Sequence, residues 1–167
     1  MSAAARATVR RVAIGSDHGG FELKAKLIPF LQRQGFEVAD LGTHSPQPCD
    51  YPRIGYKVAD AVAQGRFDRG VLLCKSGVGI AIAANKVPGI RAAVCGDLFD
   101  AERSRRHNDA NVLVIGAEKL SAVQAQRIVA KWFATPFEGG RHERRVRQIT
   151  AIERTVLTRK TARARTG

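Results

Sequence analysis

The sequence predicts an α/β protein, a Rossmann-like three-layer α/β/α sandwich built on a five-stranded parallel sheet. Two observations point to this fold class. Short apolar runs alternate along the chain with longer amphipathic segments, which is the pattern of right-handed βαβ units. The run RGVLLC at 69–74 is apolar almost throughout, as expected for a strand buried on both faces of a parallel sheet.

Five segments are expected to form strands, because each is a short apolar run bounded by polar residues or glycine. They are 11–16, 36–42, 69–74, 90–96 and 111–116.

Six segments are expected to form helices, because most place apolar residues at helical spacing. They are 21–35, 51–65, 77–86, 98–107, 121–134 and 141–157. Gly35 is a suitable stop for the first helix. Ser121 and Gln124 have the spacing of a capping box at the start of the fifth.

The chain is expected to hold one domain, because 167 residues suit a single core. We expect this domain to span residues 11–157. Residues 1–10 would form a flexible basic N-terminus, and residues 158–167 a basic, mobile tail.

Composition excludes several classes of protein. No apolar stretch approaches the ~20 residues that span a bilayer, and the basic N-terminus lacks the apolar region of a secretory signal. Cys49, Cys74 and Cys95 show no Cys-x-x-Cys spacing. We therefore expect a cytoplasmic protein without structural disulfides and without a membrane partner.

The net charge of +13 raises nucleic-acid binding as an alternative function. The excess is concentrated at the ends, with +3 in residues 1–12 and +7 in residues 139–167. The body between them is nearly balanced, and no basic patch is interleaved with aromatic residues. We therefore expect no nucleic-acid partner.

The turn CKSGVG follows the third strand, and ligands of parallel sheets bind beyond the carboxyl ends of strands. Gly77 and Gly79 would let backbone N–H groups converge on an anion. The start of the next helix favours a thiolate at Cys74. A thiolate facing N–H donors is a base facing an oxyanion hole. The alternative is a tight turn with a buried structural cysteine.

Two further stretches carry candidate polar groups. Asp17 and His18 follow the first strand, where Asp17 could simply cap the next helix. His107 lies among amides and an acid just before the fifth strand, which suits proton transfer, although a lone histidine is more often a surface or packing residue. Arg141 and Arg145 are four apart on one helix face. They could bind a phosphate or form a solvated basic face.

Together these stretches resemble the ribose-5-phosphate isomerase B family, which includes the galactose-6-phosphate isomerase subunits. The matching segments are IGSDHGGFELK, DYP, CKSGVGIAIAANKVPGIRAA, SRRHNDANVLVIGA and FEGGRHERRV, and they span residues 12–152 in order.

The resemblance implies an aldose–ketose isomerase that interconverts ribose 5-phosphate and ribulose 5-phosphate through a cis-enediol, with no metal or cofactor. It places the catalytic base on Cys74, a hydroxyl on Ser76 and the ring-opening group on His107. The implied substrate contacts are Asp17, His18, Tyr51, Ser76, Gly77, Val78, Gly79 and Asn108, with Arg141 and Arg145 on the phosphate. It also implies a homodimer, or a tetramer built from it, with active sites shared between subunits.

Three positions bear on activity and substrate. Some family members use a glutamate where this chain has Ile80, which places it with the cysteine-dependent type. Lys75 stands where the family has glycine, and Glu118 where many members have a phosphate-binding arginine. The alternatives are a tetrose phosphate or 6-phosphohexose substrate, or a non-catalytic relative that senses sugar phosphates. Glu118 would have to turn away from the phosphate or pair with a cation.

Overall fold

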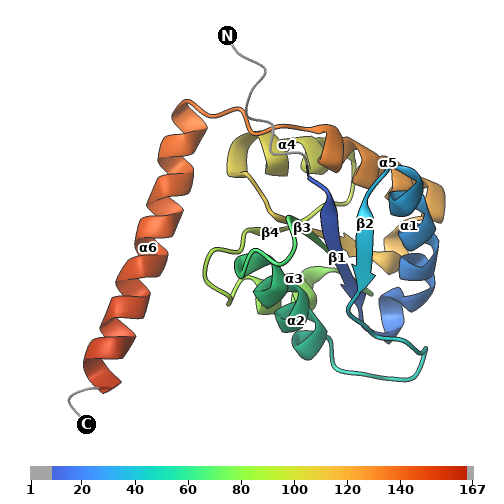
Figure 1. Ribbon diagram of the computed structural model, residues 1–167, viewed down its shortest axis with the longest axis horizontal. Coiled ribbons are helices and arrows are strands. Elements are labelled where there is room, and N and C mark those ends of the chain that lie inside the picture. Colours follow the sequence, from blue (N-terminus) through green and yellow to red (C-terminus); the bar gives the residue numbers. More distant parts are fainter. Residues whose placement is uncertain (1–8, 165–167) are drawn as a thin grey trace.

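The computed structural model describes residues 9–164, so the predictions for residues 1–8 and 165–167 lie outside it. Its centre is a five-stranded, all-parallel sheet, as the sequence predicts. The strand order is β2-β1-β3-β5-β4 (Figure 1). The strands are β1 (Arg11–Ser16), β2 (Glu37–Asp40), β3 (Arg69–Cys74), β4 (Ala92–Val94) and β5 (Val112–Gly116).

Helices cover both faces of the sheet, because alternate strand residues point to opposite sides. Val12 and Ile14 of β1 join one buried cluster with α1, α4 and α5. Ala13, between them, joins a second cluster with α2 and α3. The helices are α1 (Phe21–Arg33), α2 (Tyr51–Ala63), α3 (Val78–Ala84), α4 (Leu98–Asn108), α5 (Ala122–Ala134) and α6 (Arg141–Ala164).

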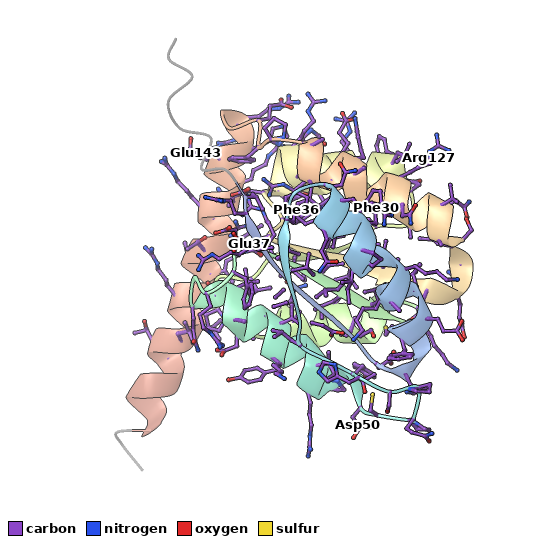
Figure 2. The ribbon with its side chains drawn as sticks, turned by 45° about the vertical axis from the view of Figure 1, so that its right-hand side comes forward. Phe30, Phe36, Glu37, Asp50, Arg127 and Glu143 are labelled. Atoms are coloured by element: carbon purple, nitrogen blue, oxygen red, sulfur yellow. The ribbon has the colours of Figure 1, made fainter. Side chains whose placement is uncertain are left out.

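Local signals are also confirmed. The Ser121 Oγ accepts a hydrogen bond from the Gln124 N–H, and the Gln124 Oε1 accepts one from the Ser121 N–H. The predicted capping box therefore begins α5. Phe36, labelled in Figure 2, lies just before β2. Its ring centroid is 4.6 Å from that of Phe133, and this contact joins the start of β2 to α5.

The strand order creates a switch point between β1 and β3. The chain leaves β1 to one side to form β2 and crosses to the other side to form β3. The turns that follow β1 and β3 therefore lie next to each other at the carboxyl edge of the sheet, where ligands of such sheets bind. Gly20 makes this approach possible, since a Cβ there would lie 2.6 Å from the Leu73 Cβ.

The helix α4 runs back from the carboxyl edge to the amino edge of the sheet. It begins four residues after the end of β4 and finishes just before β5. Asn111 lies between α4 and β5, and its carbonyl accepts a hydrogen bond from the Gly70 N–H. The last turn of α4, which contains His107, therefore lies at the amino edge.

The last helix, α6, projects beside the body of the molecule (Figure 1). The sequence predicts that it ends at residue 157, which is wrong, since it continues to Ala164. Residues 158–164 are Thr, Arg, Lys and Ala, with no glycine or proline to stop a helix. Among residues 9–164, no helix is both long enough and apolar enough to cross a bilayer.

Two contacts join the first described residues to the body of the domain. The Arg10 N–H donates to the Asp68 carboxylate at 2.9 Å. Val9 is partly buried and packs against the larger buried cluster.

Candidate active site

The side chain of Cys74 ends β3 and is almost completely buried at the switch point. Its Sγ accepts a hydrogen bond from the Gly77 N–H at 3.1 Å. Gly77 has a φ of 82°, a left-handed conformation that favours glycine and turns its N–H back toward the sulfur. A hydrogen bond to the sulfur stabilises the thiolate, which is the form that acts as a base.

The loop that follows Cys74 lies beside the thiol and contributes further groups. The Ser76 Oγ accepts a hydrogen bond from the Val78 N–H at 3.3 Å. Tyr51, at the start of α2, lies directly over Gly79, where a Cβ would meet the tyrosine ring at 2.6 Å. The absence of a side chain at Gly79 therefore lets the tyrosine approach the backbone at the start of α3.

The turn after β1 supplies Asp17 and His18. Asp17 is buried, and its Oδ1 accepts hydrogen bonds from the N–H groups of Gly19 and Gly20, which confirms the capping role. The cap closes a short 3-10 turn, η1 (His18–Gly20). The His18 Nδ1 accepts from the Cys49 N–H at 3.2 Å, so the neutral ring carries its proton on Nε2.

Lys75 and Glu118 lie beside each other next to the loop that follows Cys74. The Lys75 Nζ is 3.8 Å from the Glu118 Oε1, and the Glu118 N–H donates to the Lys75 carbonyl at 3.1 Å. Glu118 belongs to a second 3-10 turn, η2 (Ala117–Lys119), that follows β5. The expectation that Glu118 pairs with a cation is confirmed. Both side chains are mostly exposed, so the pair itself contributes little stability.

These residues form the carboxyl-edge group, defined here as Asp17, His18, Tyr51, Cys74 and the loop 76–79. The structure brings this whole set together. Figure 2 marks its place through Asp50, which directly precedes Tyr51.

The other predicted site residues gather at the opposite edge. His107 and Asn108 end α4, and Arg141 and Arg145 lie in the first turns of α6. We call these four residues the amino-edge group. Glu143, next to this group, lies at the end of the molecule opposite Asp50 in Figure 2.

Around His107, two residues that the sequence analysis missed complete the cluster. The buried His142 stacks its ring on that of His107, with centroids 4.0 Å apart and planes 5° from parallel. The Arg141 Nε donates to the His142 Nε2 at 3.4 Å. Burial lowers the pKa of His142, and the charge of His107 lowers it further. Both effects favour the neutral form of His142.

Glu138 is the second missed residue, and it lies 3.7 Å from the His142 Nε2 through its Oε1. A hydrogen bond from Arg106 lowers the pKa of the Glu138 carboxyl. Arg103 contacts the other histidine of the stack, and its guanidinium lies 3.1 Å from the His107 Nε2. The motif EGGRHERR contains both Glu138 and His142, but neither stands out by spacing alone.

One chain does not bring the two groups together. They lie at opposite ends of the strands, and a five-residue strand such as β5 spans about 13 Å between its first and last Cα atoms. Cys74 and His107 therefore cannot act on the same sugar within one chain as it is folded here.

A family model, curated relatives and solved structures all match this chain to the same family. Residues 12–149 match the model of a family described as Ribose/Galactose Isomerase. The chain is 48% identical over 145 residues to ribose-5-phosphate isomerase B of Escherichia coli, covering 87% of this chain and 97% of that protein. It is 39% identical to D-erythrulose-4-phosphate isomerase of Pectobacterium atrosepticum, and the match covers 85% of this chain and 94% of that protein.

A solved structure supports the same grouping. The ribose-5-phosphate isomerase B of Clostridium thermocellum superposes with a TM-score of 0.86 at 50% identity, covering 87% of this chain and 99% of that one. The family model covers most of the chain, and the relatives match it over nearly their whole length. The chain belongs to the ribose/galactose isomerase family.

Proposed function

We propose that the protein interconverts ribose 5-phosphate and ribulose 5-phosphate through a cis-enediol. The observation that carries the proposal is the placement of Cys74, a buried thiol at the switch point whose sulfur receives an N–H hydrogen bond. The similarity to ribose-5-phosphate isomerase B, at 48% identity, supports the choice of sugar.

In the proposed reaction, the Cys74 thiolate removes the proton from C2 of the open-chain aldose. The electron pair moves to the carbonyl at C1 and forms an enediolate. N–H groups at the start of α3 stabilise its negative charge. The thiol then returns its proton to C1, and the hydroxyl proton on the C2 oxygen passes to the C1 oxygen. The C2 oxygen thereby becomes the ketone and the C1 oxygen a hydroxyl, so atoms and charge balance. The Ser76 hydroxyl lies within the same loop and can hold an enediol oxygen.

The amino-edge group serves the other two steps. His107 transfers the proton that opens the furanose ring, and Arg141 and Arg145 hold the phosphate. Because these residues lie far from Cys74 in one chain, we propose a homodimer in which each site combines the carboxyl-edge group of one protomer with the amino-edge group of the other.

The surface of α6 supports an assembly of this kind. A groove of about 720 Å³ lies between α6 and the segments around residues 85–93 and 108–110. Ile149, Ile152 and Val156 line it from α6 and are each at least 45% exposed. An apolar face of this sort on a projecting helix favours burial against a second copy.

Exchange with solvent tests the reaction directly. Purified protein with a metal chelator is incubated with ribose 5-phosphate in D₂O and followed by NMR. We expect ribulose 5-phosphate to form and solvent deuterium to appear at the reacting carbons, because the thiol exchanges its proton. Product without any deuterium would indicate direct hydride transfer, and the absence of product would contradict the proposed function.

The phosphate contacts give a second prediction. The variant Arg141→Ala should raise KM for ribose 5-phosphate roughly 10- to 100-fold, because a hydrogen bond to a charged group contributes about 1.5–3 kcal/mol. Inhibition by inorganic phosphate should weaken in parallel. Arg154→Ala is the matched control, since Arg154 is exposed and lies thirteen residues further along α6. Equal effects of the two variants would show a general charge effect and contradict the assignment.

A tetrose phosphate is a second candidate substrate, because the Lys75–Glu118 pair alters a position that binds the phosphate in many family members. The pair places a carboxylate where many family members have a phosphate-binding arginine. A carboxylate near a phosphate opposes binding by like-charge repulsion. The relative named D-erythrulose-4-phosphate isomerase, 39% identical to this chain, makes a four-carbon substrate a reasonable comparison.

We therefore expect Glu118→Arg to lower KM for ribose 5-phosphate relative to KM for erythrose 4-phosphate. The measurement is kcat/KM for phosphorylated tetroses, pentoses and hexoses, with Lys75→Gly as the partner variant. A wild-type protein that strongly prefers ribose 5-phosphate, together with an unchanged KM in Glu118→Arg, would exclude a role of this pair in substrate choice.

A further inference from the structure

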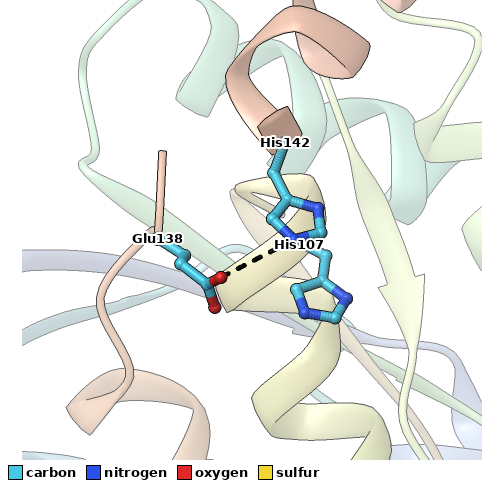
Figure 3. A group of neighbouring side chains, drawn as sticks. All are labelled: His107, Glu138 and His142. Carbon is cyan, nitrogen blue, oxygen red and sulfur yellow. Dashed lines mark ion pairs between the residues drawn. The ribbon is translucent and has the colours of Figure 1, made fainter. Parts of the chain in front are cut away.

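Three potential metal ligands converge beside the amino-edge group. His107 at the end of α4, Glu138 just before α6 and His142 in its first turn each present one ligand atom, and these atoms lie within 4.8 Å of one another (Figure 3). Figure 3 shows the two imidazole rings one above the other, with the Glu138 carboxylate at their edge.

We propose that His107, Glu138 and His142 bind a transition-metal ion of the zinc type, and that this ion inhibits the enzyme. Two imidazoles and one carboxylate are a ligand set that zinc, cobalt and nickel accept. Calcium and magnesium prefer oxygen ligands alone, so they should bind poorly. With three protein ligands, the fourth position would be open to water.

The surroundings already orient the carboxylate. Arg106 binds the Glu138 Oε2 through two nitrogens, at 2.6 and 3.0 Å, and the Arg106 carbonyl accepts the Glu138 N–H at 3.0 Å. These contacts leave the Oε1 facing the His142 Nε2 at 3.7 Å. Hydrogen bonding of one carboxylate oxygen by a neighbour is how metal-binding carboxylates are commonly held.

A bound ion would need only a small rearrangement. Tetrahedral ligands at ordinary bond lengths lie roughly 3.4 Å apart. The ligand atoms, which are within 4.8 Å of one another, must therefore close by up to about 1.4 Å. Glu138 is exposed and His107 half-buried, so both can rotate toward the buried His142. Arg103 and Arg141 contact the imidazole nitrogens and would have to turn aside. We therefore expect micromolar affinity, weaker than that of a structural zinc site.

Inhibition, unlike binding, rests on the proposed function. An ion on His107 occupies a nitrogen that ring opening requires, and it draws the ring toward Glu138. Isomerisation of ribose 5-phosphate should therefore decrease as zinc is added and recover when a chelator removes it.

Cobalt titration tests the binding site without any reference to activity. We expect Co²⁺ to give visible d–d absorption without a thiolate-to-cobalt charge-transfer band. Glu138→Gln, a change on the surface, should raise Kd for Co²⁺ at least roughly tenfold. His142→Asn should do the same if circular dichroism shows that it folds.

Two variants serve as controls. Glu102→Gln makes the same chemical change at a neighbouring carboxylate. Glu102 also contacts Arg106, but it offers no atom to the ion. His44→Asn removes an exposed histidine elsewhere. Both should leave Kd for Co²⁺ unchanged. A charge-transfer band in the wild type, or a Kd for Glu138→Gln equal to that of the wild type, would overturn the proposal.

The activity measurement then separates the two claims. Zinc should inhibit the wild type and Glu102→Gln alike, and Glu138→Gln should need at least roughly tenfold more zinc for the same inhibition. Metal binding by a protein that does not isomerise sugars would support the site and contradict the proposed function. Isomerisation by a protein that binds no metal would contradict the site alone.

Discussion

Replacing Cys74 with alanine is expected to lower kcat for ribose 5-phosphate by at least ~10²–10⁴-fold, the usual loss when a positioned base is removed. Deuterium exchange from solvent should fall by the same factor, because the thiol carries the exchanging proton. A non-isomerisable phosphorylated sugar acid should still bind in calorimetry, since Arg141 and Arg145 remain.

Cys95→Ala is the matched control, because it also removes a buried thiol. Burial raises the pKa of Cys95 to about 11, so this thiol is protonated at neutral pH and cannot serve as a base. We expect this variant to keep its kcat and to lose only some thermal stability. Near-normal turnover in Cys74→Ala would show that another group moves the proton.

The sheet could be predicted from sequence because its determinants are local. The run RGVLLC is apolar because both faces of β3 are covered by helices, and that burial leaves a direct trace in residue type. The capping box at Ser121 is likewise contained in four consecutive residues. Cys74 stands out for the same reason, since its glycines follow within five positions.

The arrangement of the site could not be read from the sequence in the same way. The stacking of His107 on His142 depends on how α4 meets α6, and the two residues are 35 positions apart with no shared pattern. The rule that ligands bind at carboxyl ends of strands locates Cys74. It gives no information on His107, which lies at the amino edge.

The end of α6 could not be predicted from the sequence for a different reason. The sequence predicts a mobile tail at residues 158–164 because they are polar and basic. Arginine, lysine and alanine are nevertheless good helix formers, so composition alone does not separate a solvated helix from a mobile segment. The helical bounds of α6 depend on propensity along the backbone, and polarity was the wrong criterion.

The separation of the two groups leads to the second large effect, restoration of activity between two inactive chains. Cys74→Ala and His107→Ala are each expected to be inactive on the cyclic sugar. If they are unfolded together and refolded as a mixture, half of the dimers contain one chain of each kind. In such a dimer, one site has both defects and the other combines an intact Cys74 with an intact His107.

Equal mixing should therefore restore about a quarter of the wild-type activity per chain, because half of the dimers each regain one of two sites, as two-fold symmetry requires. The measurement is ribulose 5-phosphate formation by each variant refolded alone and by the mixture. No gain over the separate variants would place both residues in one chain's site and contradict the shared-site proposal.

The inverse mixture provides the decisive control. A chain carrying both Cys74→Ala and His107→Ala is refolded with an equal amount of wild type. If sites are shared, every site in a mixed dimer lacks one of the two groups, and only pure wild-type dimers remain active. Activity then falls to about a quarter of that of the same total amount of wild type. If each chain holds a complete site, mixed dimers keep one active site and about half of the activity remains. The two mixtures change activity in opposite directions for the shared arrangement, so neither general instability nor poor refolding can reproduce both results.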